Sequence, residues 1–131
     1  MSNEELVVSN IMKAENTVSV KSEDFALRIV KLYKYLTTRE NDREFVMSKQ
    51  LLRSGTSIGA NIAEAEFAIS KDDFKAKLYI SLKECNESRY WIRLLHKSEF
   101  ITDNEYKSLY EDCQEILRIL IAITKTLKDG K

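Results

Sequence analysis

The carboxylate and imidazole side chains of this 131-residue chain are the first groups to test for chemistry. Glu64 and Glu66 resemble the carboxylates of di-iron helical bundles, but those sites also need Glu-x-x-His pairs on two helices. His96 is the single histidine and cannot supply such pairs, and no nucleophile or acid stands at a motif spacing from it. We interpret His96 as a surface or capping residue, and we predict no metal, no cofactor and no catalytic residue.

The thiols and glycines offer no other catalytic pattern. Cys85 and Cys113 lie in apolar, helix-like contexts without the paired spacing of metal ligands. We interpret them as reduced thiols that act as small core residues. Gly55 and Gly59 lack the lysine and the strand–turn–helix setting of a phosphate-binding loop. The sequence therefore predicts a protein that is not an enzyme.

Basic side chains are concentrated locally, although the chain is neutral overall, with 21 basic and 21 acidic residues. Residues 25–60 carry seven basic side chains against three acidic ones, and residues 98–115 are mostly acidic in their charge. A basic flank with tyrosines could contact phosphates and stack bases. Its predicted nucleic-acid contacts are Arg28, Lys31, Arg53, Arg89 and Arg93. The alternative is a solvated face that meets the acidic flank of a neighbouring subunit.

The helix that must position many of these groups contains residues 50–64, a stretch of small residues in a helical pattern. Glycine in a helix costs about 1 kcal/mol relative to alanine. Gly55, Gly59 and Ala63 therefore predict a thin face on which another helix packs closely, and the third helix, with small residues in its own stripe, is the predicted partner. An apolar stripe predicts the core side, formed by Leu51, Gly55, Ile58, Ile62, Ala65 and Ile69.

A polar line runs beside that stripe at the same spacing. It consists of Gln50, Ser54, Ser57, Asn61 and Glu64. Two interpretations remain open at this point. The line is either a satisfied hydrogen-bond network between helices or subunits, or the lining of a groove that faces a ligand or a partner.

Capping signals divide the rest of the chain into helices. Ser22 is the predicted N-cap of the first helix, which ends at a turn over residues 37–41, and the second helix begins near Asp42. Ser70 caps the third helix, and Thr102 with Glu105 forms a capping box for the fourth. Residues 1–21 are weakly periodic, with a break at residues 16–19. We therefore predict an N-terminal arm or short helix at residues 1–21, followed at residues 22–128 by an all-α, antiparallel up-down-up-down four-helix bundle.

Hydropathy bears on assembly and location. Residues 116–123 make the fourth helix apolar almost all round, which predicts burial on more than one side and hence self-association. No signal peptide is found, and no apolar run approaches the ~20 residues of a membrane span. The sequence thus predicts a cytoplasmic protein without a membrane partner.

Residues 50–64, followed by Asp73, Phe74 and a helix rich in serine and acid, resemble the bacterial four-helix-bundle proteins encoded in intervening sequences of 23S rRNA genes. The resemblance covers roughly residues 24–127 and is most specific at residues 57–58 and 61–64. Ala65 stands where that family commonly has glycine, and Phe45 lacks the proline that frequently follows it there. The resemblance implies a ring-like homopentamer with no established enzymatic activity.

A more distant likeness links the chain to the accessory bundle proteins of diversity-generating retroelements. The resemblance implies basic pentamers that bind nucleic acid and a reverse transcriptase, whereas this chain has a pI near 6.6. The sequence is therefore compatible with two functions. The first is a non-enzymatic homo-oligomeric bundle that contacts RNA or DNA through a local basic flank. The second is a protein-interaction scaffold with no nucleic-acid role.

Overall fold

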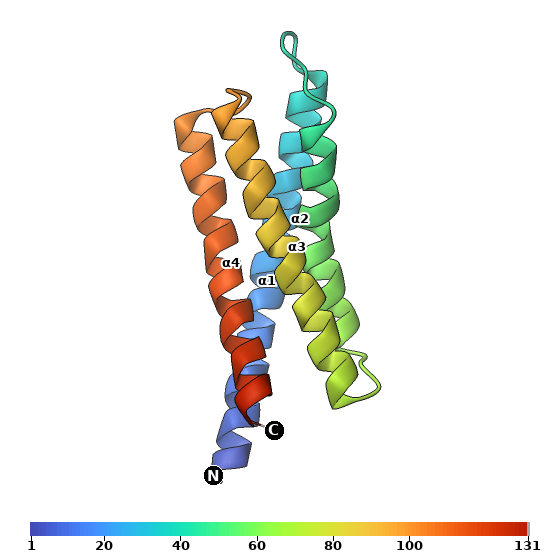
Figure 1. Ribbon diagram of the computed structural model, residues 1–131, viewed down its shortest axis with the longest axis vertical. Coiled ribbons are helices and arrows are strands. Elements are labelled where there is room, and N and C mark those ends of the chain that lie inside the picture. The colour runs from blue at the N-terminus through green and yellow to red at the C-terminus, as the bar shows by residue number, and fades with distance from the viewer. Residues whose placement is uncertain (131) are drawn as a thin grey trace.

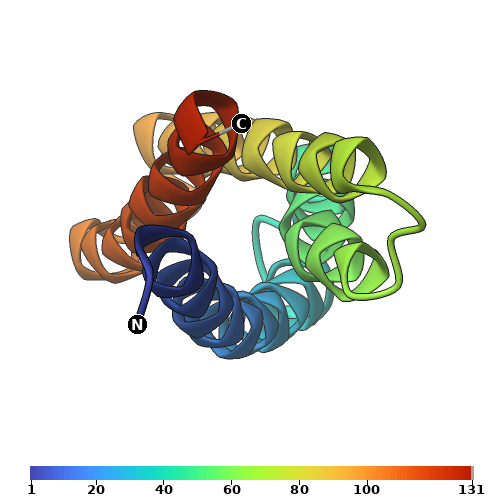
Figure 2. The ribbon, with the colours of Figure 1, turned by 90° about the horizontal axis from the view of Figure 1, so that it is seen from below.

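The protein folds as four long helices in this computed structural model, which describes residues 1–130 (Figure 1). The helices are α1 (Asn3–Thr38), α2 (Met47–Ala65), α3 (Lys71–Lys97) and α4 (Asp103–Gly130). Seen along the long axis, they form a ring in which α1 packs on α2, α2 on α3, α3 on α4, and α4 on α1 (Figure 2). The predicted all-α antiparallel up-down-up-down bundle is confirmed.

The core lies along the axis of this ring and follows the three- and four-residue spacing of the apolar stripes. Its largest fully buried side chains include Phe25, Ile29, Leu36, Leu51, Ile58, Ile62, Leu78, Ile92, Leu95, Ile116 and Leu120. Cys85 of α3 and Cys113 of α4 meet in this core with their Sγ atoms 3.7 Å apart. Each thiol donates to the backbone carbonyl of the other at 3.4 Å. This contact and burial raise the pKa of the Cys85 thiol, and both cysteines are free and buried in the core.

One continuous helix, α1, replaces the predicted break at residues 16–19 and the predicted N-cap at Ser22. Ser2 is the N-cap: its Oγ accepts the Glu5 N–H at 3.1 Å, and the Glu5 carboxylate accepts the Ser2 N–H at 3.4 Å. Val18 and Ser22 are fully buried, so packing on the bundle keeps this weakly periodic stretch helical. The predicted helix start at Ser22 is wrong, while the division into an N-terminal arm or short helix at residues 1–21 and a bundle at residues 22–128 stays a prediction.

The α1–α2 connection is longer than the sequence predicted, because α2 begins at Met47 and not near Asp42. Asp42 adopts a left-handed backbone conformation, with φ 55°, inside this loop. Glu44 is only 6% exposed, and its carboxylate accepts the N–H groups of Val46, Met47 and Ser48 at 2.7–3.0 Å. This side chain satisfies the free donors at the start of α2 and so fixes where the helix begins.

The other two connections agree better with their predicted capping signals. The Oγ of Ser70 accepts the Asp73 N–H at 3.0 Å, which confirms the start of α3. Thr102 and Glu105 form the predicted capping box at α4, with bonds of 2.8 and 3.1 Å. The predicted α2 stripe has one member too many, because α2 ends at Ala65 and Ile69 is 94% exposed in the α2–α3 loop.

The apolar part of α4 is largely buried within one chain. Ile116, Leu117, Leu120 and Ile123 all pack into the core, and of this segment only Arg118, Ile121 and Ala122 are exposed. Burying this helix therefore needs no second subunit, and self-association must be argued from other surfaces. None of the helices within residues 1–130 is long and apolar enough to cross a membrane.

Candidate interaction surfaces

The glycines of α2 bring this helix close to α1. A Cβ atom placed on Gly55 would lie 3.1 Å from Cγ1 of Ile29, and one on Gly59 would lie 3.2 Å from Oγ of Ser22. The thin face therefore meets α1, and the prediction that α3 is its partner is wrong. Ala63 is exposed and lies outside this contact. The spacing of small residues indicated a close approach but carried no information about which neighbour makes it.

Serine hydroxyls join α2 to α3 on a neighbouring face of α2. The Oγ atoms of Ser54 and Ser88 are hydrogen-bonded at 2.9 Å, and Ser81 donates to the backbone carbonyl of Ile58 at 2.9 Å. All three serines are fully buried. Of the polar line predicted on α2, Ser54 belongs to this buried seam.

The remaining members of the polar line lie on the open side of the seam. Ser57 donates to the carbonyl of Arg53 at 2.6 Å, and Asn61 donates to the carbonyl of Ser57 at 2.8 Å, so both bonds stay within α2. Glu64 is exposed, with its Oε2 3.8 Å from Nζ of Lys77 on α3, and Gln50 is half-buried. The five residues therefore do not share one network among the described contacts.

Two of the predicted nucleic-acid contacts pair with carboxylates inside the chain. Arg28 of α1 lies 2.5 Å from Oδ2 of Asp112 on α4, and Arg53 of α2 contacts Glu84 at 3.2 Å and also Glu87 on α3. Hydrogen bonds from Trp91 and from Arg53 lower the pKa of Glu87. These two pairs occupy opposite sides of the ring of helices, the α1–α4 seam and the α2–α3 seam (Figure 2).

The other three predicted contacts are also separated. Lys31 is exposed on α1. The guanidinium of Arg89, between α3 and α4, donates to Gln114 at 2.8 Å and to Asn86 at 2.7 Å, and its buried Nε has no partner among the described atoms. The guanidinium carbon of Arg93 lies 5.9 Å from the ring centroid of Tyr90. The five cations therefore do not form one patch: two lie on α1, one on α2 and two on α3.

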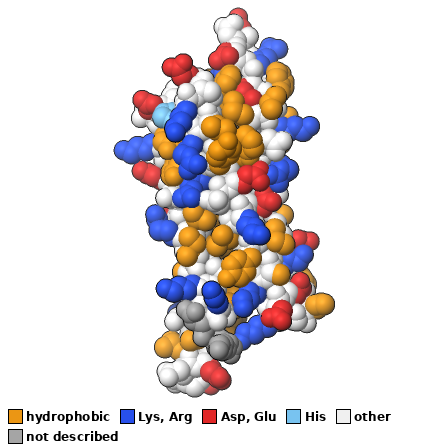
Figure 3. Space-filling model, viewed as in Figure 1, with side chains coloured by type: hydrophobic (Ala, Val, Ile, Leu, Met, Phe, Trp, Pro, Cys, Tyr) orange, Lys and Arg blue, Asp and Glu red, His pale blue; other side chains and the backbone are white. Residues whose placement is uncertain are grey.

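A second set of residues lies along the outer surface of α3, and we call it the α3 outer row. Its members are Tyr79, Lys83, Asn86, Tyr90, Arg93 and Lys97, spaced by four and three residues. Within residues 1–128, no carboxylate lies within 4 Å of its cations. Figure 3 shows Lys and Arg side chains gathered over α3 and α4 beside hydrophobic ones. The four- and three-residue spacing of this row could be seen in the sequence, parallel to the buried stripe of α3, but of its members only Arg93 was among the predicted nucleic-acid contacts.

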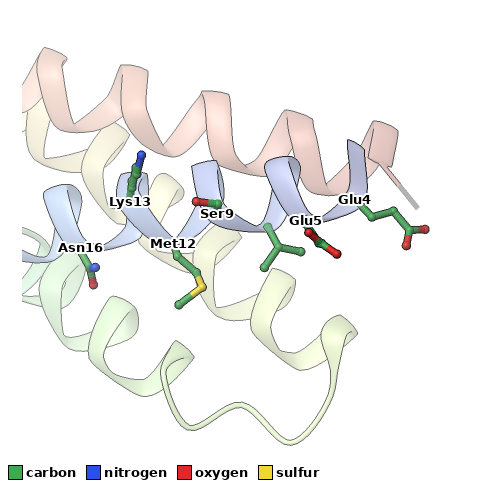
Figure 4. Close-up of a pocket in the computed structure, with 7 residues that line it drawn as sticks. Glu4, Glu5, Ser9, Met12, Lys13 and Asn16 are labelled. Carbon is green, nitrogen blue, oxygen red and sulfur yellow. The ribbon is translucent and has the colours of Figure 1, made fainter. Parts of the chain in front are cut away.

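A hollow surface at the amino-terminal end of α1 was not predicted. Because α2 ends at Ala65, the first turns of α1 lack an α2 neighbour, and Figure 4 shows part of their uncovered side, with Met12 on the side of the α2–α3 loop. Two adjoining hollows of about 640 and 350 Å³ share Met12, Glu15 and Phe74. We call them together the N-terminal groove. Its further lining includes Glu4, Val7, Val8, Ile11, Glu66, Lys71 and Leu127.

His96 has a structural setting. Its Nε2 lies 2.7 Å from Oδ1 of Asp103, at the first residue of α4, and its ring stacks on Tyr106 with centroids 4.1 Å apart. These contacts tie the end of α3 to the start of α4. Nothing in this arrangement presents a nucleophile to the imidazole.

Comparisons with known proteins agree with the resemblance stated from residues 50–64. The crystal structure of a protein of unknown function from the S23 ribosomal protein family of Bacteroides thetaiotaomicron is 56% identical, with a TM-score of 0.82. The match covers 86% of this chain and 99% of that chain. No curated protein matches the sequence. The profile of the 23S rRNA-intervening sequence proteins matches residues 14–122, and the chain therefore belongs to the 23S rRNA-intervening sequence protein family.

Proposed function

We propose that this protein is a non-enzymatic, self-associating bundle that contacts RNA or DNA through the α3 outer row. The observation that carries the proposal is that some basic side chains form ion pairs within the chain whereas those of the α3 outer row do not. Carboxylates of α3 and α4 neutralise Arg53 and Arg28, whereas Lys83, Arg93 and Lys97 have no carboxylate partner among the described side chains. A chain that is neutral overall can thereby present one cationic helix face.

The chemistry of the row fits a nucleic-acid backbone and its bases. Lysine and arginine neutralise phosphates, and exposed tyrosines provide surfaces on which bases stack. Tyr90 is exposed between Lys83 and Arg93, and Tyr79 is exposed one turn before Lys83. From Tyr79 to Lys97 the row extends about 27 Å along the helix, at ~1.5 Å per residue. Such a length suits several successive nucleotides of a single strand.

The test is an electrophoretic shift on single-stranded RNA over a range of salt concentrations. Lys83→Glu with Lys97→Glu should weaken binding at least about tenfold and lower the slope of log K against log salt by about 1.4, at ~0.7 per phosphate contact. The matched control is Lys31→Glu with Lys34→Glu, the same charge change on α1. If only the control variant loses binding, the contact lies on the flank that the sequence predicted, and the α3 outer row is the wrong site.

Large apolar side chains that are exposed to solvent in two loops support self-association. Phe45 and Val46 are exposed in the α1–α2 loop, and Phe67 and Ile69 in the α2–α3 loop. Exposed apolar patches of this kind commonly mark interaction sites. Light scattering should give a multiple of the 15.2 kDa chain mass, five times that mass for the pentamer that the family resemblance implies. A monomer at micromolar concentration would refute this part of the proposal.

A cytoplasmic location belongs to the same proposal. Cys85 and Cys113 are free and buried with their Sγ atoms in contact distance, which suits a compartment that keeps thiols reduced. Thiol titration of the unfolded chain isolated under alkylating conditions would check this, because an oxidising compartment would leave a fraction of the pair cross-linked.

A protein-interaction scaffold without a nucleic-acid role is the second candidate. The apolar N-terminal groove favours it, because a nucleic acid has little use for an apolar hollow with a carboxylate rim. A pull-down from cell extract distinguishes the two candidates. Recovery of a protein partner by a chain that shows no shift on RNA or DNA at low salt would favour the scaffold.

A further inference from the structure

The N-terminal groove combines an apolar floor with uncompensated negative charge. Val8, Met12 and Phe74 contribute to the floor. Glu15 and Glu66 line the same hollow from α1 and from the end of α2, with no cation within 4 Å of either among the described side chains. Burial and the nearby Glu66 raise the pKa of Glu15. Lys71 lies on the α3 side of the groove, and Glu4 adds a further carboxylate at its open end.

The opposite end of the bundle presents the complementary properties. Phe45 is 54% exposed and Val46 is 74% exposed, and Arg43 and Lys49 are exposed on either side of them. We call residues 43–49 the α1–α2 knob. Figure 1 places this loop and the amino-terminus at opposite ends of the long axis.

The knob is held in place by polar contacts that do not involve its apolar side chains. Buried Glu44 accepts three backbone N–H groups at the start of α2. Arg39 donates through Nε to the carbonyl of Asp42 at 2.8 Å and through NH1 to the carbonyl of Phe100 at 3.2 Å. The loop therefore keeps Phe45 and Val46 in water in one conformation, and a preorganised loop loses less freedom on binding.

We propose that the N-terminal groove of one copy receives the α1–α2 knob of a second copy, in a head-to-tail contact. Phe45 and Val46 would cover the floor at Met12 and Phe74, and Arg43 and Lys49 would approach Glu15 and Glu66. This inference deepens the self-association proposed above by naming the surfaces. Because the two surfaces differ, the contact is heterologous and generates a ring or an open chain of copies.

A second copy is favoured over a foreign helix because the complement is present on the same polypeptide. The larger hollow, about 640 Å³, has room for a phenylalanine and a valine side chain together. The groove is rich in carboxylates and the knob is basic, so long-range attraction also has the correct sign. Residues 1–13 lie outside the part of the chain that the family profile matches, so the groove is partly a feature of this chain.

A complementation experiment tests the contact. Phe45→Asp with Val46→Asp removes the knob, and Val8→Asp with Met12→Asp removes the groove. All four positions are exposed, so helical circular dichroism should match that of the wild type. In light scattering each variant alone should have a lower mass than the wild type. An equimolar mixture should form a complex containing both variants, joined by the one intact groove and the one intact knob.

Charge reversal gives a second, independent test. Glu66→Lys places a cation opposite Arg43 of the next copy, and Arg43→Glu places a carboxylate opposite Glu66. Each single variant should associate about fivefold to tenfold more weakly, and the double variant should recover the wild-type affinity.

The outcomes separate this inference from the proposal on which it rests. A monomeric wild type would overturn both self-association and the head-to-tail contact. A wild-type oligomer whose mass is unchanged in the knob and groove variants would leave self-association standing and overturn the contact. Loss of mass without complementation in the mixture, and without rescue in the double variant, would also overturn it, because the groove would then receive something other than the knob.

Discussion

The two seams of α2 achieve close helix packing by different means. On the α1 side, Gly55 and Gly59 have no side chain, so Ile29 and Ser22 approach the backbone of α2. On the α3 side, the helices keep small side chains and join them through buried hydroxyls, as in the Ser54–Ser88 pair. The first seam depends on the absence of side chains at the two glycines, and the second depends on satisfied hydrogen bonds. They should therefore fail under different substitutions.

Gly55→Leu should have the largest effect. Even a Cβ at this position would lie 3.1 and 3.2 Å from Cγ1 and Cγ2 of Ile29, a branched side chain that is only 1% exposed. Overpacking of this kind costs about 1–3 kcal/mol. Urea denaturation should show the loss as a lower midpoint with an unchanged slope.

Ala63→Leu is the matched control, with an added side chain on the same helix. Ala63 was assigned to the thin face from the sequence, but it is exposed in the structure. Its replacement should change the free energy of unfolding by no more than about 0.5 kcal/mol, as is usual for surface positions. Equal losses in the two variants would show that the α1 seam does not depend on the space at Gly55.

The serine seam should respond to loss of a hydrogen-bond partner. Ser88→Ala leaves the Ser54 hydroxyl buried with a single distant acceptor, the Leu51 carbonyl at 3.4 Å. We expect a loss of about 0.5–1.5 kcal/mol, and less than the sum of the single losses when Ser54→Ala is combined with it. Ser57→Ala is the control, because that hydroxyl bonds only within α2. Additive losses at Ser54 and Ser88 would mean that the hydroxyl pair contributes no coupling to the seam.

The sequence predicted the helices of the bundle better than it predicted which helix packs on each face of α2. Stripes spaced by four and three residues, with caps at Ser70 and Thr102, were sufficient for the bundle and for two of its connections. Glycine spacing predicted a thin face without naming its neighbour, since the stripes of α1 and α3 both offered possible partners. Glu44 was missed as a cap because it acts from a loop three residues before α2.

The candidate surfaces were harder to predict than the fold. Arg28 and Arg53 belong to basic stretches of the sequence, but long-range ion pairs with Asp112, Glu84 and Glu87 balance their charge in space. The N-terminal groove exists because α1 extends beyond the end of α2. The weak periodicity of residues 1–21 did not predict that α1 would be this long. Which charges remain unpaired and which apolar side chains remain uncovered are properties of the assembled bundle.

The smallest effect should come from the charged edge of the serine seam. Glu87 accepts from Nε1 of Trp91 at 2.9 Å and contacts Arg53, and both hydrogen bonds lower its pKa in the folded protein. A carboxylate with a lowered folded-state pKa stabilises the fold above its unfolded pKa, and the stabilisation disappears as the pH falls through the folded value.

Glu87→Gln should therefore be less stable than the wild type at pH 7, and the difference should vanish in strong acid. Because the Arg53 and Glu87 side chains are 49% and 36% exposed, solvent screening should keep the difference below about 1 kcal/mol. Thermal unfolding from pH 7 to pH 2.5 measures it, with Glu111→Gln, an exposed carboxylate on α4, as the control. If the stability difference between Glu87→Gln and the wild type persists unchanged at the lowest pH, packing of the Glu87 side chain and not its charge stabilises this edge of the seam. Charge would then contribute to neither seam of α2.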